Sequence, residues 1–217
     1  MTEQRLFDPT DPPEWLDPEW WRDRPHCDHL GSPTGAHIAR LREAAALAAK
    51  ASSLIDSSSS TSCVVDLGAG DGALLSLLPD PLRDVSFGYD IIRADVLYAN
   101  EVRGVKVWLR NVNKAIRNGA PIAGPVCVLT EVLEHMADPH GFLAALRQHA
   151  IVGQARSKLR YVVASSPWGE TAEQHEWNHA WAWDEGGYEA MFEAAGFKAR
   201  EFQRVEWSQL WLFEAIR

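Results

Sequence analysis

Short apolar runs and longer amphipathic segments alternate along this chain. The runs are four to six residues long and end at small or polar residues, and the longer segments repeat their apolar positions at helical spacing. The short runs predict buried strands at 63–67, 85–89, 105–109, 126–129 and 159–164, with a final pair at about 199–205 and 210–216. The longer segments predict helices at about 36–52, 73–78, 91–100, 139–146 and 188–195. We also expect Ser32 or Thr34 to cap the helix at 36–52, and residues 57–62 to form a serine-rich linker.

The sharpest break in the pattern follows the first strand, where Gly68, Gly70 and Gly72 introduce a helix. A strand, a glycine turn and a helix open a βαβ unit, whose ligands lie at the carboxyl ends of the strands. A dinucleotide-binding turn would place its third glycine three residues after the second, whereas Gly72 follows Gly70 by two. Because Asp66 and Asp71 flank the turn, we expect a ligand with positive charge.

A second acidic group ends the next predicted strand. Asp90 lies twenty-two residues after Gly68. In nucleoside-binding βαβ units, an acid at about this spacing accepts hydrogen bonds from ribose hydroxyls. The sequence therefore predicts that Asp90 binds a ribose.

The glycine turn and a later segment resemble two motifs of one enzyme family. The stretch Asp-Leu-Gly-Ala-Gly-Asp-Gly at 66–72 resembles the first motif of class I S-adenosylmethionine (SAM)-dependent methyltransferases. The stretch Glu-Val-Leu-Glu-His at 131–135, followed by Asp138 and Pro139, resembles the fourth. The resemblance covers about residues 60–217. It implies an α/β fold: a Rossmann-like, seven-stranded, mostly parallel sheet with helices on both faces and a C-terminal antiparallel hairpin.

The same resemblance implies SAM as the cofactor. In this family the residue just past the third strand hydrogen-bonds the adenine amine, and Asn111 and Asn113 are the two candidates here, with Asn111 preferred. The expected cofactor-binding residues are Asp66, Gly68, Ala69, Gly70, Asp90, Asn111 and Thr130.

The acidic pair and the histidine of the later motif also suggest a metal site. If residues 131–135 are helical, Glu131, Glu134 and His135 share one face. Two carboxylates and an imidazole suit Mg²⁺ or Mn²⁺. The same motif occurs in methyltransferases without a metal, so the alternative is that His135 acts as a base or a structural partner.

The run from His179 to Asp184 resembles a motif of the bacterial small-RNA 3′-terminal 2′-O-methyltransferases. That family holds a divalent metal with a Glu-x-x-Glu-His motif and a later histidine. The resemblance implies Glu131, Glu134, His135 and His179 as metal ligands. The expected catalytic residues are Glu131, His135 and His175, where His175 is an alternative base.

Residues 1–35 form a segment of different character. They hold six prolines together with Trp15, Trp20 and Trp21, and a disordered tail would be poor in tryptophan. We therefore expect an arm, residues 1–35, that folds back over a methyltransferase domain, residues 36–217, either as a substrate lid or as a strap over the core. His26, Cys27 and His29 are interpreted as a loop cluster and not as a metal site.

Composition narrows the partners. The net charge of −9 disfavours a general nucleic-acid binder, because such proteins neutralise phosphates. Cys63 and Cys127 lie in apolar runs and are expected to be reduced core thiols. The acidic, proline-rich N-terminus is no signal peptide and no run reaches transmembrane length, so we expect a soluble cytoplasmic protein without a membrane partner.

Three functions are consistent with these features. The first is methyl transfer from SAM to an oxygen, with nitrogen as the alternative, of a small-molecule acceptor. The second is a divalent-metal-dependent 2′-O-methyltransferase that acts on an RNA 3′ end. The third is a non-catalytic SAM-fold binding protein.

Overall fold

The computed structural model describes residues 3–31, 36–55, 63–121, 124–152 and 158–216. The expected cap at Ser32 or Thr34 and the linker at 57–62 lie outside these residues.

Cys27, Cys63 and Cys127 are free thiols, and Cys127 is buried, as expected. Within the described ranges, no helix combines the length and apolar character that are needed to cross a membrane.

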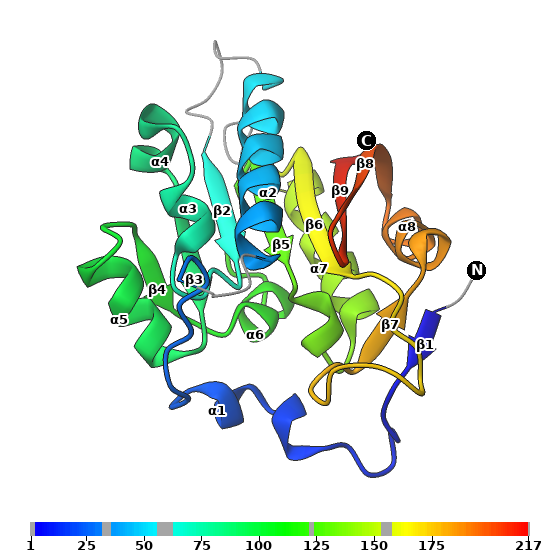
Figure 1. The fold of residues 1–217 in the computed structure, drawn as a ribbon. Helices are drawn as coiled ribbons and strands as arrows, with labels where there is room; N and C mark the ends of the chain where they lie inside the picture. The colour runs from blue at the N-terminus through cyan, green and yellow to red at the C-terminus, as the bar shows by residue number, and fades with distance from the viewer. Residues whose placement is uncertain (1–2, 32–35, 56–62, 122–123, 153–157, 217) are drawn as a thin grey trace.

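The main sheet has seven strands in the order β4-β3-β2-β5-β6-β9-β8 (Figure 1). Strand β2 pairs in parallel with β3 and β5, and β9 pairs antiparallel with β6 and β8. This order confirms the predicted mostly parallel sheet with its C-terminal hairpin. The strands are β2 (Val64–Leu67), β3 (Phe87–Asp90), β4 (Val107–Leu109), β5 (Val126–Thr130), β6 (Tyr161–Pro167), β8 (Phe197–Val205) and β9 (Ser208–Ala215).

Helices cover both faces of this sheet, and each face has its own apolar core. Successive residues of a strand point to opposite faces, so Val64 and Val128 join one core whereas Val65 and Cys127 join the other. The first core is covered by α2 (Ala36–Ser53), α3 (Ala73–Ser76) and α5 (Arg93–Glu101). The second is covered by α6 (Val112–Arg117), α7 (Pro139–Val152) and α8 (Glu185–Ala194). This layering explains why the central strands read as unbroken apolar runs.

The short helices at 80–85 and 112–117 were not expected from the sequence. Helix α4 (Asp80–Val85) carries Pro81 in its first turn, where proline is tolerated. Pro81 therefore lies inside a helix and does not merely end the preceding one. Val85 consequently ends a helix and does not begin a strand. Helix α6 begins at Val112 and is capped by Asn111, whose Oδ1 accepts a hydrogen bond from the backbone N–H of Lys114 at 3.0 Å.

The N-terminal arm crosses the edge of the main sheet at which its parallel strands end (Figure 1). Its first element, β1 (Glu3–Arg5), pairs antiparallel with β7 (Trp181–Trp183) in a separate two-stranded sheet. The 3₁₀ helix η1 (Glu14–Leu16) and helix α1 (Pro18–Trp21) follow. The arm therefore contacts the protein at both ends of its path before it enters α2.

Candidate active site

A cavity of about 910 Å³ lies at the carboxyl ends of the parallel strands, at the upper end of the usual range for ligand pockets. Its lining combines the glycine turn after β2, the N-terminal arm, residues 130–137 and the segment 167–179 with residues of α2, the segments around the ends of β3 and β4, and Trp207. Residues from both ends of the sequence thus meet over one site.

The glycine turn has a backbone that other residues would not adopt. Gly68 and Gly70 have φ angles of 106° and 50°. A Cβ built on Gly68 would lie 2.5 Å from Cγ2 of Val132, so no side chain fits between the turn and the segment after β5. The turn therefore exposes bare backbone to the cavity, as the sequence predicts.

Asp66 lines the cavity directly before this turn. The carboxylate is almost fully buried, and its Oδ1 has no hydrogen-bond partner among the described residues. Burial, reinforced by the nearby charge of Asp90, raises the pKa of Asp66 to about 8. Buried acceptors are almost always paired, so this oxygen is suited to a donor on a ligand.

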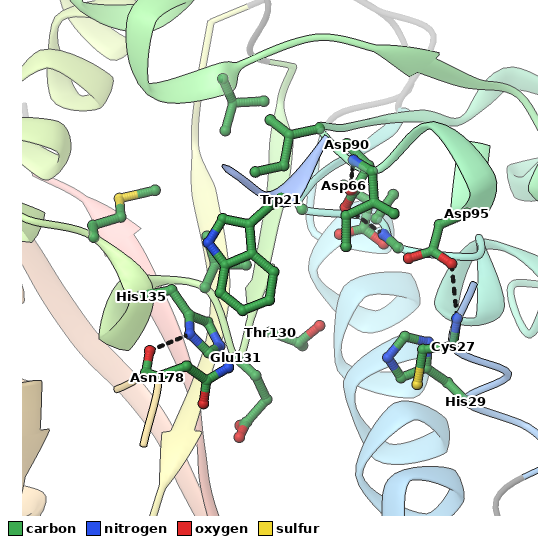
Figure 2. A pocket seen from close by; sticks show the side chains of 18 of the residues that line it. Trp21, Cys27, His29, Asp66, Asp90, Asp95, Thr130, Glu131, His135 and Asn178 are labelled. Atoms are coloured by element: carbon green, nitrogen blue, oxygen red, sulfur yellow. Dashed lines mark hydrogen bonds between the residues drawn. The ribbon is translucent and has the colours of Figure 1, made fainter. Parts of the chain in front are cut away.

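Asp90 ends β3 and braces the turn. Its Oδ2 accepts a hydrogen bond from the backbone N–H of Gly70 at 2.7 Å, and its Oδ1 accepts one from Ile92 at 2.8 Å (Figure 2). Burial raises the pKa of Asp90. Since each carboxylate oxygen has two lone pairs, both oxygens retain capacity for ligand hydroxyls.

The other expected cofactor residues also line the cavity: Ala69, Asn111 and Thr130. Asn113, the alternative to Asn111, lines it as well. The Oδ1 of Asn111 caps α6, which leaves its Nδ2 available, and the Oδ1 of Asn113 accepts from Arg117 at 2.7 Å. Both asparagines therefore remain candidates for the adenine contact.

Asp71 has a different role from the one that its position in the motif suggests. It is fully buried and accepts hydrogen bonds from the ring of His29 at 3.0 Å and from Arg103. Burial alone would raise the pKa of Asp71, but these two partners lower it to about 2. Burial alone would lower the pKa of His29, but the hydrogen bond to Asp71 outweighs this effect and raises the pKa to about 10. Asp71 is thus paired with protein cations, whereas Asp66 and Asp90 remain as the acidic groups of the turn that can respond to a ligand.

Glu134, His135 and His179 form a second cluster, whose potential ligand atoms all lie within 4.8 Å of one another. Glu134 is fully buried, and neither of its carboxylate oxygens has a hydrogen-bond partner among the described residues. Burial, together with the charge of Glu131, raises the pKa of Glu134 well above its usual value. A buried carboxylate with two unpaired oxygens is suited to a cation.

Each histidine of the cluster is oriented through Nδ1. His135 Nδ1 lies 2.9 Å from the carbonyl oxygen of Asn178, which only accepts, so Nδ1 carries the proton and Nε2 has the free lone pair (Figure 2). Burial, with the neighbouring His179, lowers the pKa of His135 to about 4, so it is neutral at pH 7. His179 Nδ1 lies 2.7 Å from Oε2 of Glu170. Such backing of a histidine by a carbonyl or carboxylate is typical of metal ligands.

Glu131 lies outside this cluster. Its φ of 54° takes it out of helical geometry, and only Leu133–His135 form a short 3₁₀ helix, η2. The condition under which Glu131, Glu134 and His135 would share one helical face is therefore not met. Glu131 instead pairs with Arg40 at 3.3 Å and accepts a hydrogen bond from Ser165 at 2.7 Å.

His175 does not line the cavity. Its Nδ1 lies 3.0 Å from the carbonyl oxygen of Thr171, a contact within the loop. The sequence made it an alternative to His179 or a base in its own right, but its ring contacts the backbone of its own loop. The structure instead adds Arg40, Glu170 and Trp207, three lining residues that were not among the expected site residues. Arg40 was missed because its partner Glu131 is distant along the chain.

Solved structures share this fold at low sequence identity. The [4+2]-cyclase SpnF aligns with a TM-score of 0.59 at 11% identity over 93% of both chains. Magnesium protoporphyrin IX methyltransferase (ChlM) from Synechocystis, with bound SAH, aligns at 0.58 and 13% identity over 90% of this chain and 92% of that one. The methyltransferase domain of bacterial CtHen1 aligns at 0.57 and 16% identity over 82% and 100%. No protein-family model and no curated protein matches the sequence. This chain has the fold of the SAM-dependent methyltransferases.

Proposed function

We propose that this chain is a SAM-dependent methyltransferase that methylates an oxygen of a small-molecule acceptor. The observation that carries the proposal is the buried carboxylate of Asp66, whose Oδ1 has no hydrogen-bond partner in the described part of the chain, beside the bare backbone of Gly68 and Gly70. SAM carries an ammonium and a sulfonium, so both features suit it. In the reaction, the acceptor oxygen bonds to the methyl carbon as the carbon–sulfur bond breaks, the sulfur keeps the electron pair and the acceptor loses a proton.

The residues of the turn divide the recognition of SAM. Asp66 offers Oδ1 to the ammonium, and Asp90 offers lone pairs to the ribose hydroxyls. Gly68, Ala69 and Gly70 let the backbone approach, and Thr130 borders the cavity at the end of β5. The adenine amine needs an acceptor; the preferred Asn111 uses its Oδ1 as a cap, so it would accept through the second lone pair of that oxygen.

Glu134, His135 and His179 fit Mg²⁺ or Mn²⁺, with Glu131 proposed as a fourth ligand from the family resemblance. The fit rests on the two unpaired oxygens of Glu134 and on the free Nε2 of His135. A bound divalent ion lowers the pKa of a coordinated hydroxyl. Glu131 would have to exchange its pairing with Arg40 for this role, whereas the other three already converge.

His135 has an alternative role as the base. Its ring is neutral at pH 7, and its Nδ1 proton is fixed on the carbonyl of Asn178. Its Nε2 lone pair is therefore available to take the acceptor proton. A metal at this nitrogen would exclude that role, so the two functions of His135 are alternatives.

The test is isothermal titration of the protein with S-adenosylhomocysteine (SAH). We expect binding, and a loss of at least about tenfold in affinity for Asp66→Ala, since the ammonium loses its only unpaired carboxylate acceptor at the turn. Absence of SAH binding to the unmodified protein refutes the proposal. Transfer of a radiolabelled methyl group from SAM to any acceptor would exclude the third reading, a non-catalytic SAM-fold protein.

The cluster of Glu134, His135 and His179 also favours a second candidate function, the metal-dependent 2′-O-methylation of an RNA 3′ end. Its test is methylation of a short single-stranded RNA with and without a chelator. Activity that disappears with the chelator would support this function, and activity that the chelator leaves unchanged would remove it.

A further inference from the structure

Four tryptophans gather at the mouth of the cavity. Trp15, Trp20 and Trp21 come from the arm, and Trp177 comes from the segment that carries His179. Trp21 stacks on Trp177 with ring centroids 6.4 Å apart and an interplanar angle of 19°, and Trp15 and Trp20 meet Trp177 edge-on. Trp177 is 61% exposed, so the group borders solvent. Two segments more than 150 residues apart thus form one aromatic surface.

Trp21 extends this surface to the reaction site. Its ring centroid lies 6.0 Å from that of His135, and both residues line the cavity. Its indole N–H donates to the carbonyl oxygen of Trp15 at 2.6 Å, which fixes the plane of the ring. In the view of Figure 2, the indole lies between His135 on one side and Asp66 and Asp90 on the other. An acceptor beside His135 would therefore lie close to Trp21.

The two segments of the mouth are strongly acidic. Residues 3–31 hold eight Asp or Glu against three Arg, a formal charge of −5, and residues 168–180 hold three Glu and no Lys or Arg, a charge of −3. These segments account for −8 of the chain's −9, so the remainder carries about −1. The charge that disfavours nucleic acid is thus concentrated in the two segments that line this side of the cavity.

The cations of the arm already have partners. Arg22 pairs with Glu19 at 3.0 Å, and the guanidinium of Arg24 lies 3.2 Å from the ring centroid of Trp20. Arg5 lies over the ring of Trp181. They therefore offer little to a phosphate, whose binding needs unpaired Lys or Arg.

We propose that Trp21 and its aromatic neighbours are the binding surface for the acceptor, and that the acceptor is a planar aromatic molecule without negative charge. This rests on the proposed function and names its substrate class. Tryptophan faces attract planar rings, and cationic ones more strongly, whereas the surrounding carboxylates repel anions. The same charges disfavour an RNA 3′ end, the second candidate function.

The test measures equilibrium binding of four probes to the SAH-loaded protein in Mg²⁺ buffer. Catechol, 3,4-dihydroxybenzylamine and 3,4-dihydroxybenzoate share one ring and differ in charge, and a single-stranded RNA of about twenty nucleotides is the fourth. We expect the amine to bind at least as tightly as catechol, the benzoate at least tenfold more weakly, and the RNA not measurably.

Three variants separate the contribution of the Trp21 ring to probe binding from that of the carboxylate charge. Trp21→Ala should weaken catechol binding at least tenfold, and Trp21→Phe should restore most of it, because a planar face remains. Glu176→Gln, which removes an exposed carboxylate of the cavity wall, should narrow the ratio of amine to benzoate affinity about two- to threefold. Trp108→Phe, on the far edge strand β4 and outside the cavity, is the matched control and should change nothing.

Each other result overturns the inference. RNA or benzoate that binds as tightly as catechol contradicts the charge argument, and unchanged catechol binding in Trp21→Ala contradicts the aromatic one. Failure of all three ring probes to bind the SAH-loaded protein also overturns it. Failure to bind SAH itself is a separate result that refutes the proposed function.

Discussion

The half of the cavity around the glycine turn comes from one continuous stretch, residues 66–113, whereas the half around His135 combines three segments far apart in the sequence. In the first half, β2, the turn and α3 follow one another, and Asp90 ends the next strand. In the second half, the arm, residues 130–137 and the segment 167–179 meet only in the folded protein. The first half is therefore defined by local backbone geometry, and the second depends on long-range contacts between side chains.

Both halves nevertheless share one electrostatic feature. Each holds a buried carboxylate with at least one oxygen that lacks a partner in the described structure: Asp66 in the first half and Glu134 in the second. Burial raises the pKa of both, so each is costly to ionise until a cation arrives. The two buried carboxylates therefore predict one cationic ligand in each half of the cavity. Because the first half depends on local backbone geometry and the second on long-range contacts, we expect substitutions to affect ligand binding and stability differently in the two halves.

The largest expected effect tests the long-range contacts of the second half. Arg40→Met should lower the free energy of unfolding by about 3–5 kcal/mol, because it leaves Glu131 charged and largely buried without its partner. Chemical denaturation measures this. The matched control is Lys50→Met, which breaks the exposed pair with Glu201 and should cost at most about 1 kcal/mol. A loss below 1 kcal/mol for Arg40→Met would show that Glu131 does not need this contact.

The next effect tests the local geometry of the first half. Gly68→Val should weaken SAH binding about 100-fold, or about 2.7 kcal/mol, because the branched side chain meets Val132 and the φ of 106° excludes it. Titration with SAH measures the loss, while Mn²⁺ binding at the other half should persist.

Gly104→Ala is the control for this substitution. Gly104 also has a positive φ, 67°, but a Cβ there would meet nothing within 4 Å. It should cost about 1 kcal/mol of stability and leave SAH affinity unchanged. Equal SAH affinities for both variants would contradict the close approach between the turn and residue 132.

The same distinction explains what could be predicted from the sequence. The strands, the turn at Gly68 and the strand-end acid Asp90 depend on local pattern and spacing, and they lie where the sequence predicts. The left-handed φ of Glu131 and the pairing of Asp71 with Arg103 depend on neighbours more than thirty residues away. Because no local pattern indicates such contacts, the pairing of Asp71 with protein cations and the non-helical geometry of Glu131 could not be predicted from the sequence. The short helix α6 was missed because it packs through only a few apolar residues.

A smaller effect concerns the orientation of His179 by Glu170. Glu170→Gln should weaken Mn²⁺ binding about tenfold, because an amide holds the Nδ1 proton of His179 less strongly than a carboxylate. Titration with Mn²⁺, followed by its paramagnetic resonance signal, measures this. Glu173→Gln, on the same loop but outside the cavity, is the matched control. Equal Mn²⁺ affinity in the two variants would contradict the proposed metal role of His179.

The smallest effect links the two halves, because the arm that covers the second is attached to the turn of the first through His29 and Asp71. The pKa of His29 rises from 6.5 to about 10 on folding, so this group stabilises the folded state fully below pH 6.5, and the contribution disappears as the pH rises through 10. Asp71, lowered from 3.8 to about 2, stabilises above pH 3.8 and loses its contribution as the pH falls through 2. The contact is therefore strongest between these limits, from about pH 4 to 6.5.

His29→Phe keeps an aromatic ring but removes the charge, so it should cost about 1 kcal/mol of unfolding free energy at pH 6 and progressively less toward pH 10. Urea denaturation of both proteins at pH 6, 8 and 9.5 measures this difference. Asp71 retains Arg103 in the variant, so its ionisation should not change the comparison. A difference that is independent of pH would mean that His29 holds the arm by packing alone. A difference that fades with rising pH would show that closure over the acceptor half is stabilised by the acid of the cofactor turn.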